Sequence, residues 1–148
     1  MATTTASLTI TSADLVGDAL SLSSSKVLHK AGTTVGLDQT TGMASLYLTA
    51  TTQLDIFPVL PATPAGQNLQ SWVYICNKST DETEFITVSI AATTIGLLYA
   101  GDFMWMPWSQ IAQKADIEIA PSTGAASTGI NVEYTCIHEG LTYPTSGD

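Results

Sequence analysis

The chain has 148 residues, a formal net charge of −9, and 11% charged residues, whereas soluble domains average about 25%. Its four basic residues are all lysines and form no cluster, and nucleic-acid binding depends on clustered cations. The composition therefore argues against nucleic-acid binding and, for the same reason, against attraction to anionic membrane surfaces.

The chain begins with small polar residues, and a short alternating strand follows at residues 7–11. Leu20 and Leu22 alternate with serines, which predicts a further strand that extends towards Leu28. We predict an N-terminal arm over residues 1–12 and a single β domain over residues 13–148. A length of 148 residues fits one ordinary domain.

The middle of the chain contains the clearest period-two pattern. Ala44, Leu46 and Leu48 share one side of residues 44–50, which predicts a strand. A proline-rich connection follows, with prolines at positions 58, 61 and 64. Residues 72–76 are apolar on both faces and predict a central strand. The polar residues 77–84 and the alternating residues 86–90 predict that these two strands form a hairpin with a long loop.

The last third of the chain contains further short strands. An apolar run at residues 95–99 and a large-side-chain run at residues 103–108 precede alternating segments at residues 116–119 and 130–136. About eight short strands separated by turn signals, with no long amphipathic helix, predict an all-β fold. We expect a single-domain β-sandwich or a jelly-roll-like barrel with an N-terminal arm.

Signals for catalysis or for a cofactor are weak in this sequence. It contains neither a nucleophile elbow nor a phosphate-binding loop. His29 and His138 lack neighbours at metal-ligand spacing. We therefore predict a protein that is not an enzyme and that has no catalytic residues, no cofactor and no metal site.

Two features leave alternatives open. The acidic turn at Asp81, Glu82 and Glu84 predicts a solvated loop, with a calcium site as the alternative. Cys76 and Cys136 each lie in an apolar run, which is typical of buried thiols, with a disulfide as the alternative.

The aromatic run at residues 103–108 is the most unusual feature of the chain. Its large rings are Phe103, Trp105 and Trp108. One interpretation is a strand whose two faces both contact the core. The other is a binding face, because tryptophan and methionine are enriched at interfaces, or a platform for a sugar. These three residues form our candidate interface, and Trp108, which follows a proline, is its leading member.

Several segments occur in an order that resembles small β-rich virion proteins of tailed bacteriophages, particularly phages of marine and freshwater bacteria. The resemblance covers about two thirds of the chain and carries no catalytic motif. It rests on residues 74–80, 84–90, 98–108, 116–119 and 131–134, with upstream similarity around residues 20–23 and Gly42.

The resemblance implies a component of a virus particle that is synthesised in the host cytoplasm. The leading hypothesis is a capsid decoration or cement protein, which would bind the major capsid protein or other virion proteins and form a homo-oligomer. The alternatives are a tail, baseplate or head–tail connector component, and a carbohydrate-binding module for a host surface.

Overall fold

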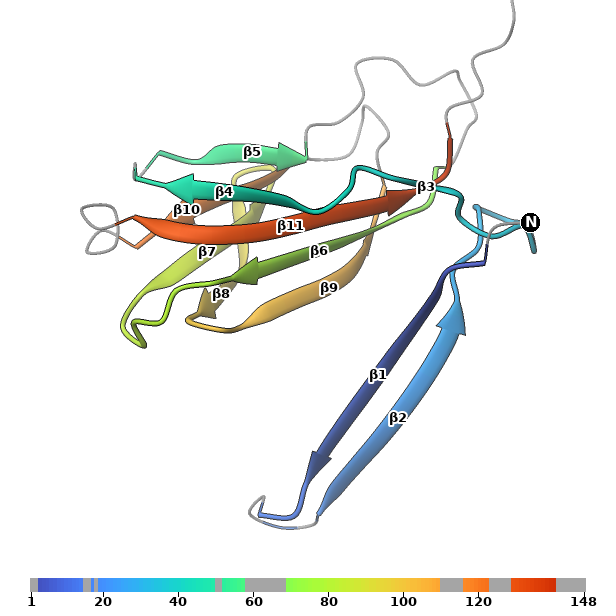
Figure 1. Ribbon diagram of the computed structural model, residues 1–148, viewed down its shortest axis with the longest axis horizontal. Helices are drawn as coiled ribbons and strands as arrows, with labels where there is room; N and C mark the ends of the chain where they lie inside the picture. The colour runs from blue at the N-terminus through green and yellow to red at the C-terminus, as the bar shows by residue number, and fades with distance from the viewer. Residues whose placement is uncertain are drawn as a thin grey trace, which may run out of the picture.

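A computed structural model describes residues 3–14, 17, 19–49, 52–57, 69–109, 116–122 and 129–140. These residues form eleven strands in three sheets and no helix, so the prediction of an all-β fold is confirmed. Two of the sheets lie face to face as a sandwich, and the third is a hairpin that projects from one end of it (Figure 1). The proline-rich connection predicted after residue 57 lies outside the described residues.

The strands have the following bounds. The projecting sheet consists of β1 (Thr5–Ser12) and β2 (Leu20–Val27). The five-stranded sheet consists of β3 (Gln39–Thr40), β4 (Ala44–Leu48), β6 (Ser71–Asn77), β9 (Phe103–Trp108) and β11 (Ile130–His138). The four-stranded sheet consists of β5 (Leu54–Phe57), β7 (Phe85–Ile90), β8 (Thr93–Tyr99) and β10 (Ile117–Pro121).

Strand order places the last described strand at the centre of the larger sheet. β11 pairs with β6 on one side and with both β3 and β4 on the other, and β9 completes the sheet beyond β6. The smaller sheet runs in the order β5, β10, β7, β8. All described pairings between named strands are antiparallel.

The core lies between the two sheets and follows the alternation in the sequence. Side chains at every second position of a strand point to the same face. Val73 and Ile75 on β6 and Ile117 and Ile119 on β10 are fully buried in this way. Other buried members include Leu48, Phe57, Ile86, Val88, Ile130, Val132 and Cys136.

The predicted hairpin between residues 72–76 and 86–90 is wrong. β6 belongs to the five-stranded sheet and β7 to the four-stranded sheet, so residues 78–84 cross between the layers. Both strands direct their apolar positions into the same core from opposite sides, and packed sheets are about 10 Å apart. Asn77, fully buried at the end of β6, joins the layers: its Nδ2 donates to the Leu98 carbonyl oxygen at 3.0 Å.

The true tight hairpin joins β7 to β8. Ile90 pairs with Thr93, so Ala91 and Ala92 are the whole connection, and both have positive φ, at 49° and 58°. Two such residues in succession are typical of the type I′ turn, where asparagine and glycine are usual. The alanines explain why residues 91–92 carry no recognisable turn signal.

The N-terminal arm is longer than predicted. Residues 5–12 pair along their whole length with residues 20–27, so the arm is a two-stranded hairpin that extends to Val27. The boundary predicted after residue 12 therefore divides one structural unit.

The described residues include no helix that is long and apolar enough to cross a membrane.

Candidate protein-contact surface

The structure separates the three predicted interface residues onto the two faces of β9. Pairing with β6 directs Met104, Met106 and Trp108 towards the core, and Phe103 and Trp105 outward. Trp108 is only 9% exposed and packs on Phe57 with ring centroids 5.9 Å apart. Trp108 is therefore a core residue, and the prediction that it leads a contact surface is corrected. Phe103, at 59% exposed, and the half-buried Trp105 remain on the surface.

Two further aromatic residues join them on the outer face of the five-stranded sheet. Trp72 stacks on Trp105, with centroids 5.4 Å apart and ring planes at 21°. Tyr74 lies beside Phe103 at 6.2 Å. Trp72 and Tyr74 are not among the interface residues predicted from the sequence. The available signal was that residues 72–76 are apolar on both faces, which leaves one aromatic face outside the core.

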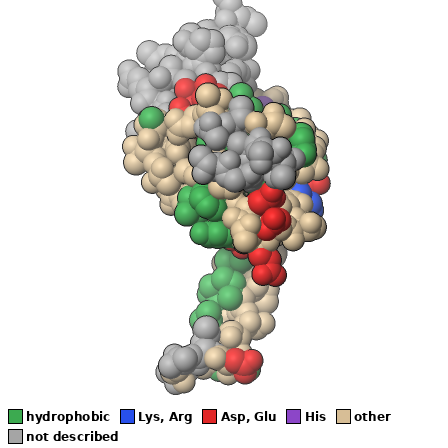
Figure 2. Space-filling view, turned by 90° about the vertical axis from the view of Figure 1, so that its left-hand side faces the viewer, with side chains coloured by type: hydrophobic (Ala, Val, Ile, Leu, Met, Phe, Trp, Pro, Cys, Tyr) green, Lys and Arg blue, Asp and Glu red, His purple; other side chains and the backbone are tan. Residues whose placement is uncertain are grey.

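The projecting hairpin has two chemically different faces. Strand pairing places the apolar residues Ala6, Leu8, Ile10, Leu20 and Leu22 on one face, together with Lys26 near the base. The opposite face consists almost entirely of serine and threonine. The four large apolar side chains are each 42–45% exposed. Figure 2 shows this apolar face as a stripe along one side of the hairpin.

A groove of about 650 Å³ separates the hairpin from the aromatic face. Ala6, Leu8 and Lys26 line its hairpin wall, and the four aromatic residues of β6 and β9 line the other. None of the described residues that line it is acidic. The neighbouring Cys76 side chain, together with partial burial, raises the pKa of Tyr74 to about 12, so this phenol is neutral at physiological pH. The groove is therefore largely apolar and bears a single lysine.

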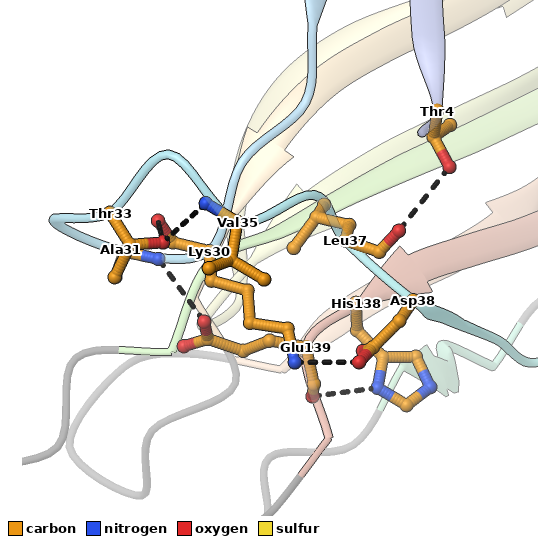
Figure 3. Close-up of polar contacts among 9 residues, drawn as sticks. All are labelled: Thr4, Lys30, Ala31, Thr33, Val35, Leu37, Asp38, His138 and Glu139. Atoms are coloured by element: carbon orange, nitrogen blue, oxygen red, sulfur yellow. Dashed lines mark hydrogen bonds and ion pairs between the residues drawn. The ribbon is translucent and has the colours of Figure 1, made fainter. Parts of the chain in front are cut away.

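The base of the hairpin is anchored to the sandwich by buried leucines and by hydrogen bonds (Figure 3). Leu28 and Leu37 are 1% and 0% exposed, and their backbones pair with each other and with Thr4. Lys30 forms an ion pair with Asp38 at 2.6 Å, and this hydrogen bond lowers the pKa of the Asp38 carboxyl. These contacts fix the start and the end of the hairpin beside the five-stranded sheet.

Glu139 connects three segments at this base. Glu139 is 7% exposed. Its carboxylate accepts hydrogen bonds from the backbone N–H groups of Ala31 at 3.1 Å and Gln70 at 3.0 Å. Figure 3 shows the first of these contacts. A buried carboxylate is compatible with folding when such donors satisfy it. The role of Glu139 has no signal in the sequence, because neither donor is near it in the chain.

We expect Glu139→Gln to lower the free energy of unfolding by about 1–3 kcal/mol, because the glutamine amide keeps one acceptor oxygen and presents N–H groups to the other donor. Urea denaturation followed by tryptophan fluorescence measures the change. Glu82→Gln is the matched control, since Glu82 lies exposed in the acidic turn, and it should change stability by less than about 0.5 kcal/mol. Equal effects of the two substitutions would contradict the anchoring role.

The acidic turn uses its carboxylates to hold its own backbone. Asp81 Oδ1 accepts hydrogen bonds from the Thr83 backbone N–H at 2.9 Å and from its hydroxyl at 2.7 Å, and these bonds lower the pKa of Asp81. The Ser79 hydroxyl donates to Glu84. Across the described part of the chain, no three Asp, Glu, His or Cys side chains gather as a group able to hold a metal.

The two cysteines lie on opposite faces of the five-stranded sheet. Cys136 pairs with Val73 and faces the core, whereas Cys76 pairs with Glu133 and lies on the outer side. Both thiols are buried, and no disulfide joins them. The two histidines have different contacts: the backbone of His29 forms a β-bridge with Gly36, and His138 Nδ1 lies 3.1 Å from the Glu139 carbonyl oxygen.

Comparison of the chain with protein-family models, with curated proteins and with solved structures finds no match. Function is therefore inferred from the groove and from the resemblance described above.

Proposed function

We propose that this chain is a non-enzymatic structural protein that binds other proteins through the groove between its hairpin and its aromatic face. The observation that carries the proposal is that two apolar surfaces face each other across this groove while remaining accessible. Exposed contiguous apolar surface on a soluble domain is typical of a protein-interaction site. Tryptophan, tyrosine and phenylalanine, which line one wall, are the residues enriched at such sites.

The setting we propose is the particle of a tailed phage, with assembly after synthesis in the host cytoplasm. The resemblance to small β-rich virion proteins favours this setting, and a compact sandwich with a projecting hairpin suits attachment at many equivalent positions. In the proposed role, the chain is a capsid decoration or cement protein that stabilises the shell by burying surface against the major capsid protein. It needs no cofactor, and it binds neither nucleic acid nor membrane.

The proposal predicts that the chain is an abundant component of the particle. We expect quantitative mass spectrometry of purified particles to give a copy number comparable to that of the major shell protein, because a decoration protein occupies the repeated sites of a symmetric shell. A handful of copies per particle would instead favour a tail, baseplate or head–tail connector component. Absence from washed particles would contradict the virion setting.

A second candidate function is carbohydrate binding at a host surface. The observation that favours it is the half-buried position of Trp105 and the exposure of Phe103 on the groove wall. However, Trp72 and Trp105 stack on each other, so each indole already has one face covered. A titration of tryptophan fluorescence with host-surface oligosaccharides distinguishes the two functions, since only a sugar site would give a saturable change.

A further inference from the structure

The projecting hairpin exposes large apolar side chains along one of its two faces. Hydrogen bonds and buried leucines hold it at its base, but Leu8, Ile10, Leu20 and Leu22 remain 42–45% exposed along its length. A two-stranded hairpin alone is at best marginally stable in water, and it gains stability by packing its apolar face on another surface. A surface that packs on these four side chains would therefore both bind the hairpin and stabilise it.

We infer that a second copy of this chain provides that cover: two copies exchange hairpins, and each hairpin packs in the groove of the other copy against its aromatic face. The inference rests on the proposed function of the groove as a protein-contact surface, and it names the partner. Both halves of the interface, the apolar stripe and the aromatic wall, belong to one chain. A two-fold arrangement therefore brings each half against its complement in a single step.

Buried area favours a reciprocal exchange over a one-way contact. A ribbon of eight residue pairs is about 27 Å long and about 10 Å wide, so one hairpin covers about 300 Å² of each partner. One such contact buries about 600 Å² in total, which is below the range of specific interfaces, whereas a two-fold exchange buries about 1,200 Å², at the lower end of that range. The exchange therefore forms a stable interface from two contacts, each of which alone buries too little area.

Charge also favours this surface for self-association. The chain has 13 acidic residues and a net charge of −9, so two copies repel each other over most of their surfaces. Figure 2 shows acidic side chains on the end of the sandwich that faces the viewer and at the tip of the hairpin, away from its base. The described residues that line the groove include Lys26 and no acidic residue. Two copies can therefore meet at the groove without burying acidic side chains against one another.

Sedimentation analysis of the purified full chain tests the inference. We expect a dimer, and we expect the double variant Leu8→Ser/Leu22→Ser to raise its dissociation constant by about 100-fold or more, since each substitution occurs twice in a two-fold dimer. Ile95→Ser/Leu97→Ser is the matched control. It removes side chains of the same exposure, 44% and 43% against 45% and 43%, from β8 outside the groove. The control should change the constant by no more than about twofold.

Phe103→Ser tests the other wall without altering the hairpin, and we expect it to weaken the dimer by about tenfold or more. A chain that is monomeric at about 100 µM would overturn the inference. A dimer weakened by the β8 control and not by the hairpin and Phe103 variants would also overturn it. The proposed function is tested separately by copy number on particles. A monomer that still occupies the particle would remove the exchange and leave the structural role intact.

Discussion

Replacing Trp108 with alanine is expected to lower the free energy of unfolding by about 3–5 kcal/mol, as large-to-small substitutions of buried aromatic residues generally do. Trp108 is 9% exposed and contacts Phe57 in the core between the sheets. Its removal leaves a cavity that the surrounding core side chains can fill only in part. Urea denaturation followed by far-UV circular dichroism measures the change without depending on the deleted fluorophore.

Phe103→Ala, on the same strand, is the control, because Phe103 is 59% exposed. We expect it to change the free energy of unfolding by less than about 1 kcal/mol. If Trp108→Ala does not fold at all, Trp108→Phe keeps a ring in the core and should show a smaller loss in the same direction. Equal stability of Trp108→Ala and the parent chain would place Trp108 outside the core and restore it as a surface candidate.

The second large effect is expected at Asn77, where alanine should cost about 3 kcal/mol. The Asn77 side chain donates to the Leu98 carbonyl oxygen and accepts from the Ser79 backbone N–H at 2.8 Å. Asn77 is fully buried, and its Nδ2 also donates to the Glu84 carbonyl oxygen at 3.4 Å, so the substitution leaves these backbone groups without their side-chain partner. Each unsatisfied buried group costs about 1–3 kcal/mol. Thermal and urea denaturation both measure this loss.

Asn131→Ala is the control for Asn77→Ala. Asn131 lies exposed on β11, and its Oδ1 accepts a hydrogen bond from the Ser45 hydroxyl, which water can replace. We expect its loss to cost no more than about 0.5 kcal/mol. If the two asparagine variants were equally stable, the side chain of Asn77 would not be what joins the layers.

The sequence predicted the class of fold because alternation is a local property. Residues 44–48, 86–90 and 117–119 repeat apolar side chains with a period of two, and each forms a strand with those side chains buried or half-buried. The pairing of strands is not local. The run at 86–90 alternates in the same way whether its neighbour is β6 or β10, so the predicted hairpin with residues 72–76 was as consistent with the pattern as the observed crossing.

The candidate site was predicted only in part, for a related reason. Residues 103–108 are large and apolar at nearly every position, so no alternation indicates which face is inward. Pairing with β6 decides it: Met106 lies opposite the buried Val73, and this places Trp108 in the core and Trp105 outside. The hairpin escaped prediction because Leu20 and Leu22 alternate as they would in a core strand. Their exposure results from the absence of a second sheet over that face among the described residues.

The position of β11 has a consequence for the order of events during synthesis. This strand, residues 130–138, holds β3 and β4 on one side and β6 on the other, so it is the centre of the five-stranded sheet. The ribosome releases it after all the strands it joins. Until then β4 and β6 expose unpaired edges, and the hairpin base lacks Glu139. The nascent chain therefore carries these unpaired strand edges, which favour aggregation, until residues 130–139 have emerged, and the base of the hairpin acquires its contacts only then.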